Sequence, residues 1–452
     1  MWKKLRHKLD NITPAQAIIS FYFLAVSVSV LLLRIPAVHQ EGVEVSLMDT
    51  IFTAISSVSV TGLTVVNISE TYSTFGIFVL LFVFQFGGIG VMTLGTFFWL
   101  ILGRKIGLRG RQLIAVDHNQ TTLAGLVALI REILKIILLV ELVGALILGF
   151  HFMQYYPSAK EAFLHGLFAS ISATTNAGLD ITGESFMPYA NDYFVQLITI
   201  ILITLGAIGF PVLIEFKNYL FQKDTQGLPF RFSLFTKLTT ITFAGLLVFG
   251  TIMILLLEFQ HYFKDMAWHK ALFYAFFQSA STRSGGLTTM NINDFSDPTL
   301  LGISVLMFIG ASPSSVGGGI RTTTLALIIL FLFHFARGKR NIKIFKREIH
   351  EDDILKALAV TILAGIICIT SVIILVITER HSLLSIVFEV CSAFGTTGLS
   401  MGITPDLSTI GKWVIMTLMF IGRIGLASLL LMVRGKEQDV NYHYPKERII
   451  IG

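Results

Sequence analysis

The 452-residue sequence has few charged residues and few cysteines. Only 14% of the residues are charged, whereas 54% are hydrophobic and the mean hydropathy is +0.76; soluble proteins are about 25% charged. The two cysteines, Cys368 and Cys391, lie in apolar stretches and form no disulfide framework. Walker, metalloprotease and nucleophile-elbow motifs are missing, and no small-residue cleavage site closes the first apolar run. These absences exclude a soluble enzyme, a disordered chain and a disulfide-stapled chain.

Long apolar runs are what the sequence does have. Six runs of 20 residues or more contain no charged residue: 11–33, 71–103, 193–214, 238–257, 298–320 and 357–378. A helix needs about 20 apolar residues to cross a bilayer. Two further apolar spans, 136–150 and 413–433, carry one central charge each, Glu141 and Arg423. The sequence therefore predicts an all-α polytopic membrane protein with eight crossings.

The basic residues indicate the orientation. With eight crossings, 25 of the 34 Lys and Arg residues fall on the side of both termini and only six on the other side. Because cytoplasmic loops are enriched in Lys and Arg, both termini are predicted to be cytoplasmic. The net charge of +6 is thus a topology signal and requires no nucleic acid.

A motif recurs four times at nearly constant spacing. In each copy a Phe lies ten residues before a Gly, and a Leu follows that Gly directly; the four glycines are Gly62, Gly178, Gly286 and Gly398. A second glycine follows 24–28 residues later in each copy, at Gly87, Gly206, Gly310 and Gly422. Fixed-period similarity marks a repeat architecture. The predicted units are 1–111, 112–223, 224–340 and 341–434, followed by a cytoplasmic tail, 435–452.

Each unit is predicted to be helix, pore loop, helix. The roughly ten-residue segment before each motif glycine is too short to span a bilayer, so it must enter the membrane and return. Backbone at membrane depth is tolerated only where it is buried or lines a watery cavity. Four such loops with pseudo-fourfold symmetry predict one pore, as in potassium channels.

The loop tips predict a cation filter made of backbone carbonyls. They are Val60, Thr61 and Gly62; Asn176, Ala177 and Gly178; Ser284, Gly285 and Gly286; and Thr396, Thr397 and Gly398. Carbonyl oxygens replace the hydration shell of K⁺, and glycine permits the backbone conformations that aim them at an axis. No tip carries the acidic ring of a divalent-cation filter. The alternative is that these glycines only allow close helix packing.

The third unit contains a polar interruption that predicts a gate. It comprises Gly310, Ala311, Ser312, Pro313, Ser314, Ser315, Val316, Gly317, Gly318, Gly319, Ile320 and Arg321. Pro and a triple Gly cannot sustain a helix at the membrane centre without support. A flexible loop beneath the filter would obstruct or admit ions; the alternative is a kink packed on a neighbouring helix.

Two arginines that fall inside predicted membrane segments are singled out, because charges at membrane depth are costly. Arg423, predicted in the middle of the last span, is expected to face the cavity near the gate as a barrier to cations, or else to pair with an acid such as Glu141. Arg283 is expected to brace the filter by pairing with Asp180 or Glu389. The eleven histidines show no ligand spacing.

These features resemble the Trk/Ktr/HKT superfamily of potassium transporters. The most specific segments are Thr61-Gly62-Leu63, Asn176-Ala177-Gly178, 394–399 and 420–425, and the eight spans are similar to those of the Ktr-type bacterial potassium-uptake subunit. The resemblance implies that Gly62, Gly178, Gly286 and Gly398 coordinate K⁺, and that serine in place of such a glycine shifts preference toward Na⁺.

The resemblance also implies an assembly. It implies a homodimer with one pore per protomer, in a bacterial plasma membrane, bound to a cytoplasmic nucleotide-binding regulatory ring (RCK-type subunits). ATP or ADP would bind that partner, and this chain would carry no covalent or nucleotide cofactor. The apolar end of the tail, 442–452, would reach the dimer interface.

Three function classes make different predictions for this sequence. A potassium-translocating subunit, possibly Na⁺-dependent, would be driven by the membrane potential. A secondary transporter for another cation or a small solute predicts paired broken helices around a midplane site, whereas the sequence predicts only one broken inner helix. A membrane-embedded enzyme needs a catalytic or metal constellation that the sequence lacks.

Overall fold

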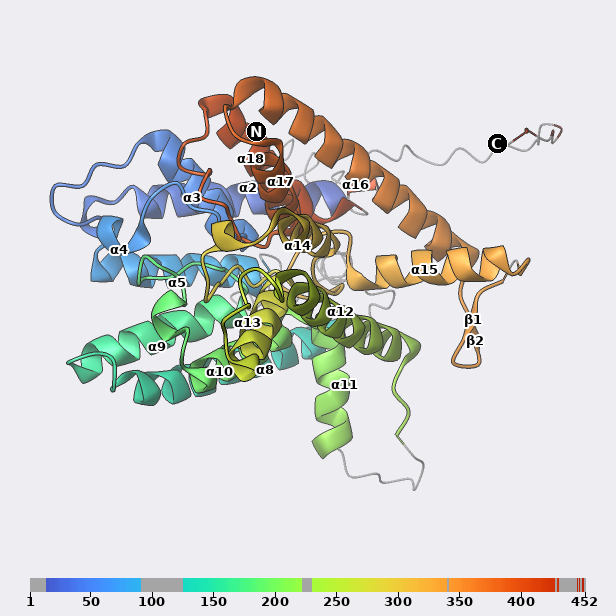
Figure 1. Cartoon of the computed structure of the whole chain (residues 1–452), viewed down its shortest axis with the longest axis horizontal. Coiled ribbons are helices and arrows are strands. Elements are labelled where there is room, and N and C mark those ends of the chain that lie inside the picture. The colour runs from blue at the N-terminus through green and yellow to red at the C-terminus, as the bar shows by residue number, and fades with distance from the viewer. Residues whose placement is uncertain are drawn as a thin grey trace, which may run out of the picture.

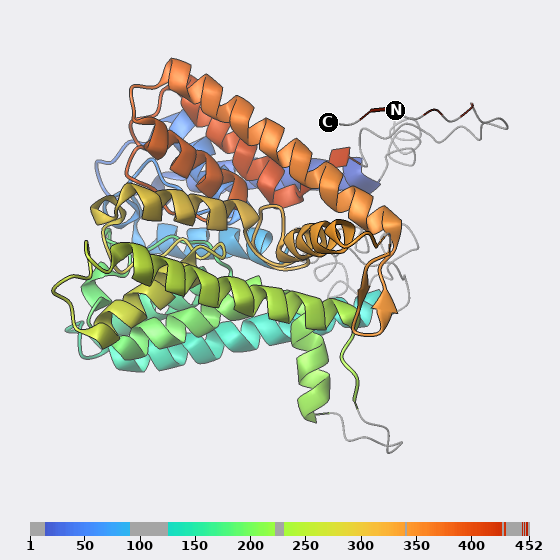
Figure 2. The same cartoon turned by 45° about the vertical axis from the view of Figure 1, so that its right-hand side comes forward.

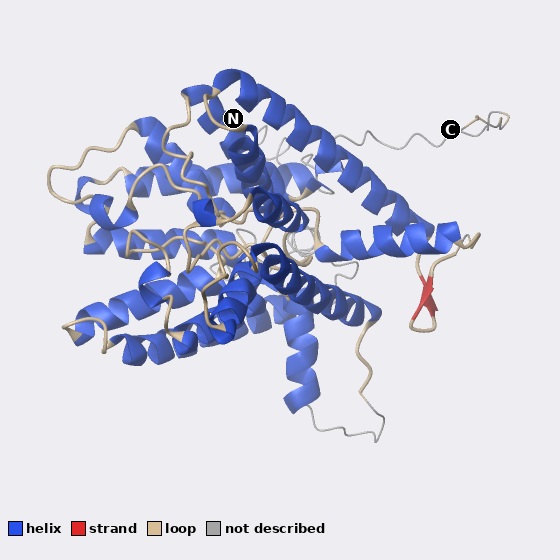
Figure 3. Ribbon diagram, viewed as in Figure 1, coloured by secondary structure: helices blue, strands red, loops and turns tan. Residues whose placement is uncertain are grey.

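The computed structural model describes residues 14–90, 125–221, 230–339 and 341–426, together with 429–430, 445, 447 and 449–450. Almost all of the regular structure in these residues is helical (Figure 3). The all-α fold predicted from the sequence is confirmed. Residues 1–13 and most of the tail lie outside the described residues, so the cytoplasmic termini and the dimer contact of the tail stay predictions.

Four described helices are long and apolar enough to cross a membrane: α2 (Pro14–Leu33), α8 (Leu126–Phe152), α12 (Leu234–Glu258) and α16 (Glu351–Thr378). At 1.5 Å per residue, each reaches about 30 Å or more. Many of their apolar side chains are exposed, as expected of surfaces that face lipid. Figure 2 shows α8 and α16 on opposite sides of the molecule. These four are the outer helices.

Each outer helix packs against the short helix that follows it. The short helices are α3 (Leu47–Ser59), α9 (Ala159–Thr174), α13 (Trp268–Ser281) and α17 (Leu383–Gly395). Three of them are directly preceded by a serine, Ser46, Ser158 or Ser382, whose side chain accepts a hydrogen bond from the backbone N–H three residues on. We call these four the pore helices.

The inner helices close the arrangement into a ring. They are α5 (Thr74–Gly88), α10 (Tyr193–Ala207), α14 (Asp297–Ile309) and α18 (Thr409–Ile424). Each packs against the pore helix of the next unit, α5 on α9, α10 on α13, α14 on α17 and α18 on α3. Since the last of these contacts returns to the first unit, the four units surround one axis.

Matching contacts join the outer and inner helices in the third and fourth units. Glu258, at the end of α12, accepts hydrogen bonds from the backbone N–H and hydroxyl of Ser296, at 2.9 and 2.7 Å. Glu379, after α16, accepts the same two bonds from Ser408. Ser296 and Ser408 are the residues that precede α14 and α18. The two units are therefore alike in side-chain chemistry as well as in helix order.

The inner helices are shorter than the sequence predicted. They contain 13 to 16 residues, and each ends within two residues of a glycine with positive φ: Gly90 (+93°), Gly209 (+105°), Gly310 (+72°) and Gly425 (+84°). A residue with positive φ ends a right-handed helix, and glycine is favoured at this position because other L-residues rarely adopt the conformation. The prediction that only the third inner helix is broken is wrong, since the second turns by 107° into α11 (Phe210–Phe221).

The remaining elements lie in the segments that connect the outer, pore and inner helices or follow them. Four of these elements have only three or four residues each: η1 (Pro36–Val38), α4 (Ile68–Thr71), η2 (Met187–Tyr189) and η3 (Ile292–Asp294). Helix α15 (Thr322–Ala336) continues the third unit, and strands β1 (Lys343–Ile344) and β2 (Arg347–Glu348) form a hairpin. Figure 1 shows α11 projecting away from the helical body.

Candidate ion pathway

The four loops after the pore helices share one backbone conformation. The motif glycine has positive φ in every loop: Gly62 (+94°), Gly178 (+67°), Gly286 (+69°) and Gly398 (+89°). The residue two positions earlier also has positive φ: Val60 (+56°), Asn176 (+54°), Ser284 (+75°) and Thr396 (+47°). Side chains disfavour this region of φ, so four repetitions outside glycine indicate a geometry imposed by the surrounding structure.

Backbone hydrogen bonds turn the loop carbonyls away from the pore helices. The N–H groups of Thr61, Ala177, Gly285 and Thr397 donate back to carbonyls of their own pore helices over 2.7–2.9 Å. In a trans peptide the C=O points opposite to the N–H. The carbonyls of the preceding residues, Val60, Asn176, Ser284 and Thr396, therefore point away from the pore helices. The hydroxyl of Ser284 donates to the Thr396 carbonyl at 2.5 Å, which ties the third loop to the fourth.

The loops approach one another so closely at the motif glycines that no side chain fits. A Cβ added to Gly62 would lie within 3 Å of the Ala177 oxygen, and one on Gly178 within 3 Å of the Gly286 Cα. One added to Gly286 would meet the Thr397 oxygen, and one on Gly398 the Thr61 oxygen, again within 3 Å. The structure therefore brings all twelve predicted filter residues together, with carbonyl oxygens beside each glycine.

The loop from Gly310 to Arg321 lies directly against two of the predicted filter residues, Ser284 and Thr396, and is mostly buried. A Cβ on Gly317 would meet the Ser284 side chain, and one on Gly318 would meet the Thr396 hydroxyl at 2.7 Å. The Arg321 guanidinium donates to the carbonyls of Ser312 and Gly317, so the loop is also held from within. We call residues 310–321 the plug loop.

The plug loop is bound to the corner between α10 and α11. Its backbone N–H groups at Ser312 and Val316 donate to the carbonyls of Ala207 and Gly206, at 3.0 and 3.2 Å. In return, the N–H of Phe210 donates to the Ser314 carbonyl at 2.8 Å. The sharp bend in the second unit is therefore the surface on which the loop of the third unit rests.

Arg423 joins the plug loop to the first unit. Its guanidinium donates to the carbonyls of Val316 and Gly87. It lies in the last turn of α18, which ends at Ile424, so the apolar span 413–433 predicted around Arg423 is not one uninterrupted helix. Glu141 is not its hydrogen-bond partner, since that carboxylate accepts from Gln85 instead. The prediction that places Arg423 beside the loop agrees with these contacts.

Arg283 is fully buried behind the third loop, but the predicted acidic partners are wrong. Its guanidinium donates to the carbonyls of Leu306 and Gly310, at 2.7 and 3.3 Å, where α14 ends. The two candidate acids are engaged elsewhere: Asp180 with Thr182 and Glu389 with Ser400. Carbonyls left free at a helix end attract a cation, so no carboxylate is needed.

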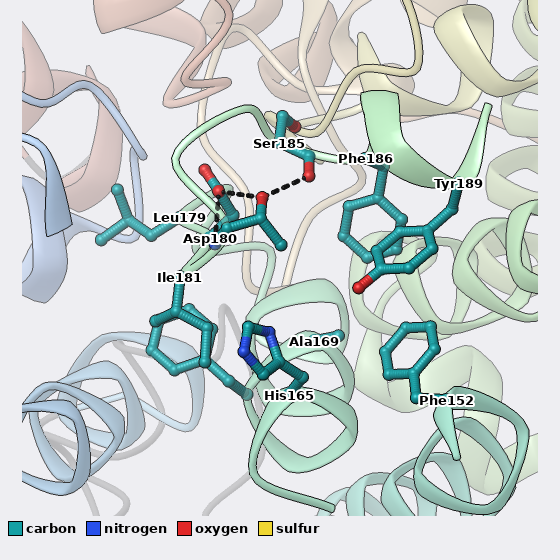
Figure 4. Close-up of a pocket in the computed structure, with 11 residues that line it drawn as sticks. Phe152, His165, Ala169, Leu179, Asp180, Ile181, Ser185, Phe186 and Tyr189 are labelled. Atoms are coloured by element: carbon teal, nitrogen blue, oxygen red, sulfur yellow. Dashed lines mark hydrogen bonds between the residues drawn. The ribbon is translucent and has the colours of Figure 1, made fainter. Parts of the chain in front are cut away.

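A cavity beside the loops contains an acidic residue that the sequence did not single out for this position. A cavity of about 370 Å³ lies over the first two loops, and its lining includes Gly62, Gly178, Asn67 and Asp180. Figure 4, a close-up of a neighbouring pocket lined by Phe186 and Tyr189, shows Asp180 directly after Leu179. The backbone N–H and the hydroxyl of Thr182 donate to the Asp180 carboxylate, at 3.0 and 2.6 Å. The Gly183 N–H donates to the same oxygen, Oδ2, at 2.7 Å, and together these bonds fix the carboxylate at the rim of the cavity. The sequence did offer one signal for this position, because Asp180 follows the motif glycine Gly178 by two residues.

Within the described residues, no group of three or more His, Cys, Asp or Glu side chains could hold a metal ion. The polar groups that converge on the axis are carbonyls and hydroxyls, with guanidinium groups at the plug loop. A ring of helical units with carbonyl-bearing loops at its axis defines an integral membrane transport protein.

The chain belongs to the TrkH family of cation transport proteins, since the sequence model of that family matches residues 4–444. It is 59% identical to "Ktr system potassium uptake protein D" of Bacillus subtilis over 444 residues, which cover 98% of both chains. It is 34% identical to "Ktr system potassium uptake protein B" of the same organism, again over 98% of each. It is 31% identical to "Potassium/sodium uptake protein NtpJ" of Enterococcus hirae, over 100% of this chain and 99% of that protein.

A solved structure supports the same fold. The potassium transporter TrkH from Vibrio parahaemolyticus superposes with a TM-score of 0.72, covering 94% of this chain and 86% of its own, at 19% identity. Family membership makes the chain a transporter and not an enzyme.

Proposed function

We propose that this chain is the membrane subunit of a potassium uptake system and that K⁺ passes through the four loops. The observation that carries the proposal is the paired positive φ at each motif glycine and two residues before it, which aims carbonyls at one axis. Carbonyl rings of this kind select K⁺ over smaller cations. The relatives named as potassium uptake proteins support the choice of ion. K⁺ is the transported substrate, held at Gly62, Gly178, Gly286 and Gly398.

The plug loop is the proposed gate. It lies against Ser284 and Thr396, and it is held by Arg321, by Arg423 and by the corner at Gly209. Two guanidinium groups at the axis also oppose the passage of cations. Opening then requires the loop to leave the corner and the Arg423 contact.

Two broken inner helices would also be expected of an alternating-access transporter. Here, however, the two breaks bind each other directly, through backbone hydrogen bonds between residues 312–316 and residues 206–210. The ion pathway is therefore the better-supported interpretation, and a midplane solute site is not proposed.

The proposed assembly is a homodimer in a bacterial plasma membrane, with cytoplasmic termini and a separate nucleotide-binding regulatory ring. The names of the relatives, which refer to a Ktr system, support the presence of partner subunits. ATP or ADP would act on that ring and alter the position of the plug loop.

Flux of monovalent cations in proteoliposomes that contain only this chain tests the function. We expect K⁺ and Rb⁺ to pass well ahead of Na⁺ and Li⁺. Equal flux of all four ions would contradict the proposed carbonyl filter. If no ion passes, protection against thermal unfolding by K⁺, and not by Li⁺, would still support the filter, whereas equal protection would contradict it.

Replacing Asp180 with Asn is expected to lower K⁺ influx at low K⁺ concentration by about threefold. A carboxylate about 4 Å from a cation contributes roughly 1 kcal/mol in water, and added salt screens this attraction. Influx at several ionic strengths is the measurement, with Glu184→Gln on the same outer loop as the matched control. The loss should shrink at high salt; a loss that is independent of salt would instead indicate a structural role for the Thr182 bonds.

A further inference from the structure

Helix α8 carries a carboxylic acid that the proposed pathway does not use. Glu141 is only 4% exposed and lies 15 residues from the first residue of α8, near the middle of a membrane-spanning helix. Its Oε2 accepts one hydrogen bond, from Nε2 of Gln85 on α5, at 2.9 Å. The other oxygens of the pair, Oε1 of Glu141 and Oε1 of Gln85, are both buried and have no hydrogen-bond partner.

No basic side chain compensates Glu141 among the described residues. The titratable residues on the helices around it are Lys160, Glu161 and His165 on α9, Tyr193 on α10, and Glu215, Lys217 and Tyr219 on α11, with none on α5. Those on α8 itself are Arg131, Glu132, Lys135 and His151, towards its two ends. None of them forms a hydrogen bond or ion pair with Glu141.

The pore helix beside Glu141 adds to the negative field. Ser170 in the last turns of α9 donates its hydroxyl to the Glu141 backbone carbonyl at 2.8 Å. The C-terminal end of a helix carries partial negative charge. An ionised carboxylate with one neutral donor at this place would be strongly unfavourable.

A single proton on Glu141 would give both unpartnered oxygens a hydrogen bond. A neutral carboxylic acid can donate its O–H from Oε1 to Oε1 of Gln85, while Gln85 keeps its N–H bond to Oε2. The two planar groups then form a cyclic acid–amide pair in which every polar atom is satisfied. We propose that Glu141 is a proton-binding site in the membrane core, occupied in the arrangement described here.

The pair is connected to the plug loop through the last turn of α5. Gln85 lies two residues before Gly87, whose carbonyl accepts from Arg423, and Arg423 also donates to Val316. A Cβ added to Gly87 would clash with the Val58 carbonyl and the Val60 side chain, so this turn cannot shift without moving the first loop. Loss of the proton to water leaves a carboxylate that attracts the Arg423 guanidinium and weakens its hold on Val316. The proton thus favours the plugged arrangement, a step that rests on the proposed function of the loop.

Infrared difference spectra of the reconstituted full chain test the proton site. We expect a protonated-carboxyl C=O band near neutral pH in wild type that Glu141→Gln abolishes and Glu161→Gln leaves in place. Glu161 is an exposed glutamate on the neighbouring helix and serves as the matched control. A band unaffected by Glu141→Gln would overturn the site, and so would a carboxylate that gains stability from added Na⁺ instead of from protons.

Flux between about pH 6 and about pH 9 tests the connection to the plug loop. Wild type and Glu161→Gln should conduct more as the pH rises, by up to about tenfold per pH unit, the limit for one proton. Glu141→Gln preserves the neutral pair and should make the flux independent of pH. An unchanged pH profile in that variant overturns the connection, whereas the infrared result stands even if K⁺ selectivity itself is absent.

Discussion

Substitution of Gly398 by serine is expected to lower the flux preference for K⁺ over Na⁺ by at least about tenfold. The side chain would begin within 3 Å of the Thr61 carbonyl and of the Gly62 Cα, so the first and fourth loops would have to separate. Losing one or two carbonyl contacts to a desolvated cation is worth about 1.5–3 kcal/mol, and 1.4 kcal/mol corresponds to a factor of ten. Paired K⁺ and Na⁺ flux in proteoliposomes, with Rb⁺ as a third ion, measures the change.

Gly402→Ser provides the matched control for this substitution. Gly402 has nearly the same backbone conformation as Gly398, with φ of +85° against +89°. A Cβ added to Gly402 meets nothing within 4 Å. Both variants therefore carry similar backbone strain, but only Gly398→Ser crowds the axis. Equal loss of selectivity in both variants, or in neither, would remove Gly398 from the filter.

The register of the four motif glycines could be predicted because glycine is required by the backbone itself. Their positive φ and their close approach leave no room for a Cβ, and such a requirement appears directly as a residue type at fixed spacing. The positive φ of Val60 and Asn176 could not be predicted in this way. Their conformation is imposed by hydrogen bonds to the pore helix and leaves no mark in the residue type.

The end of the second inner helix was missed although a local signal exists. Gly209 and Pro211 flank Phe210, and a glycine after a helix followed by a proline in the next first turn is a helix stop and start. The apolar run continues through both residues, so hydropathy alone favours one uninterrupted span. The partners of Arg283 could not be predicted, because backbone carbonyls at a helix end have no sequence signature. The end of α18 after Arg423 could not be predicted from hydropathy for the same reason as the break at Gly209, since Gly425 ends the helix inside an apolar run.

Deletion of residues 312–318 is expected to raise K⁺ flux through the isolated chain by at least about tenfold. The deletion removes the segment that lies against Ser284 and Thr396, together with its three backbone hydrogen bonds to the corner, at Gly206, Ala207 and Phe210. Three backbone hydrogen bonds at about 1 kcal/mol each would hold the plug loop on the corner with roughly 3 kcal/mol. Release of that restraint corresponds to a change of about a hundredfold in the fraction of open pathways. Flux without any partner subunit is the measurement, and lower flux at unchanged thermal stability would contradict a gate.

Arg423→Gln distinguishes the effect of the Arg423 contacts, which hold the plug loop in place, from the effect of the loop itself, which obstructs the pathway. The variant keeps the plug loop but loses the charged donor to Val316 and Gly87, so we expect a smaller rise in flux than the deletion gives. Arg131→Gln removes the same charge from an exposed position on α8 and is the control. If the deletion raises the flux and Arg423→Gln does not, the loop obstructs the pathway without being held by Arg423. If Arg423→Gln alone raises the flux as much as the deletion does, the guanidinium is the barrier and the loop only positions it. A single charge near the axis can act in this way because it repels a cation at several ångströms without direct contact.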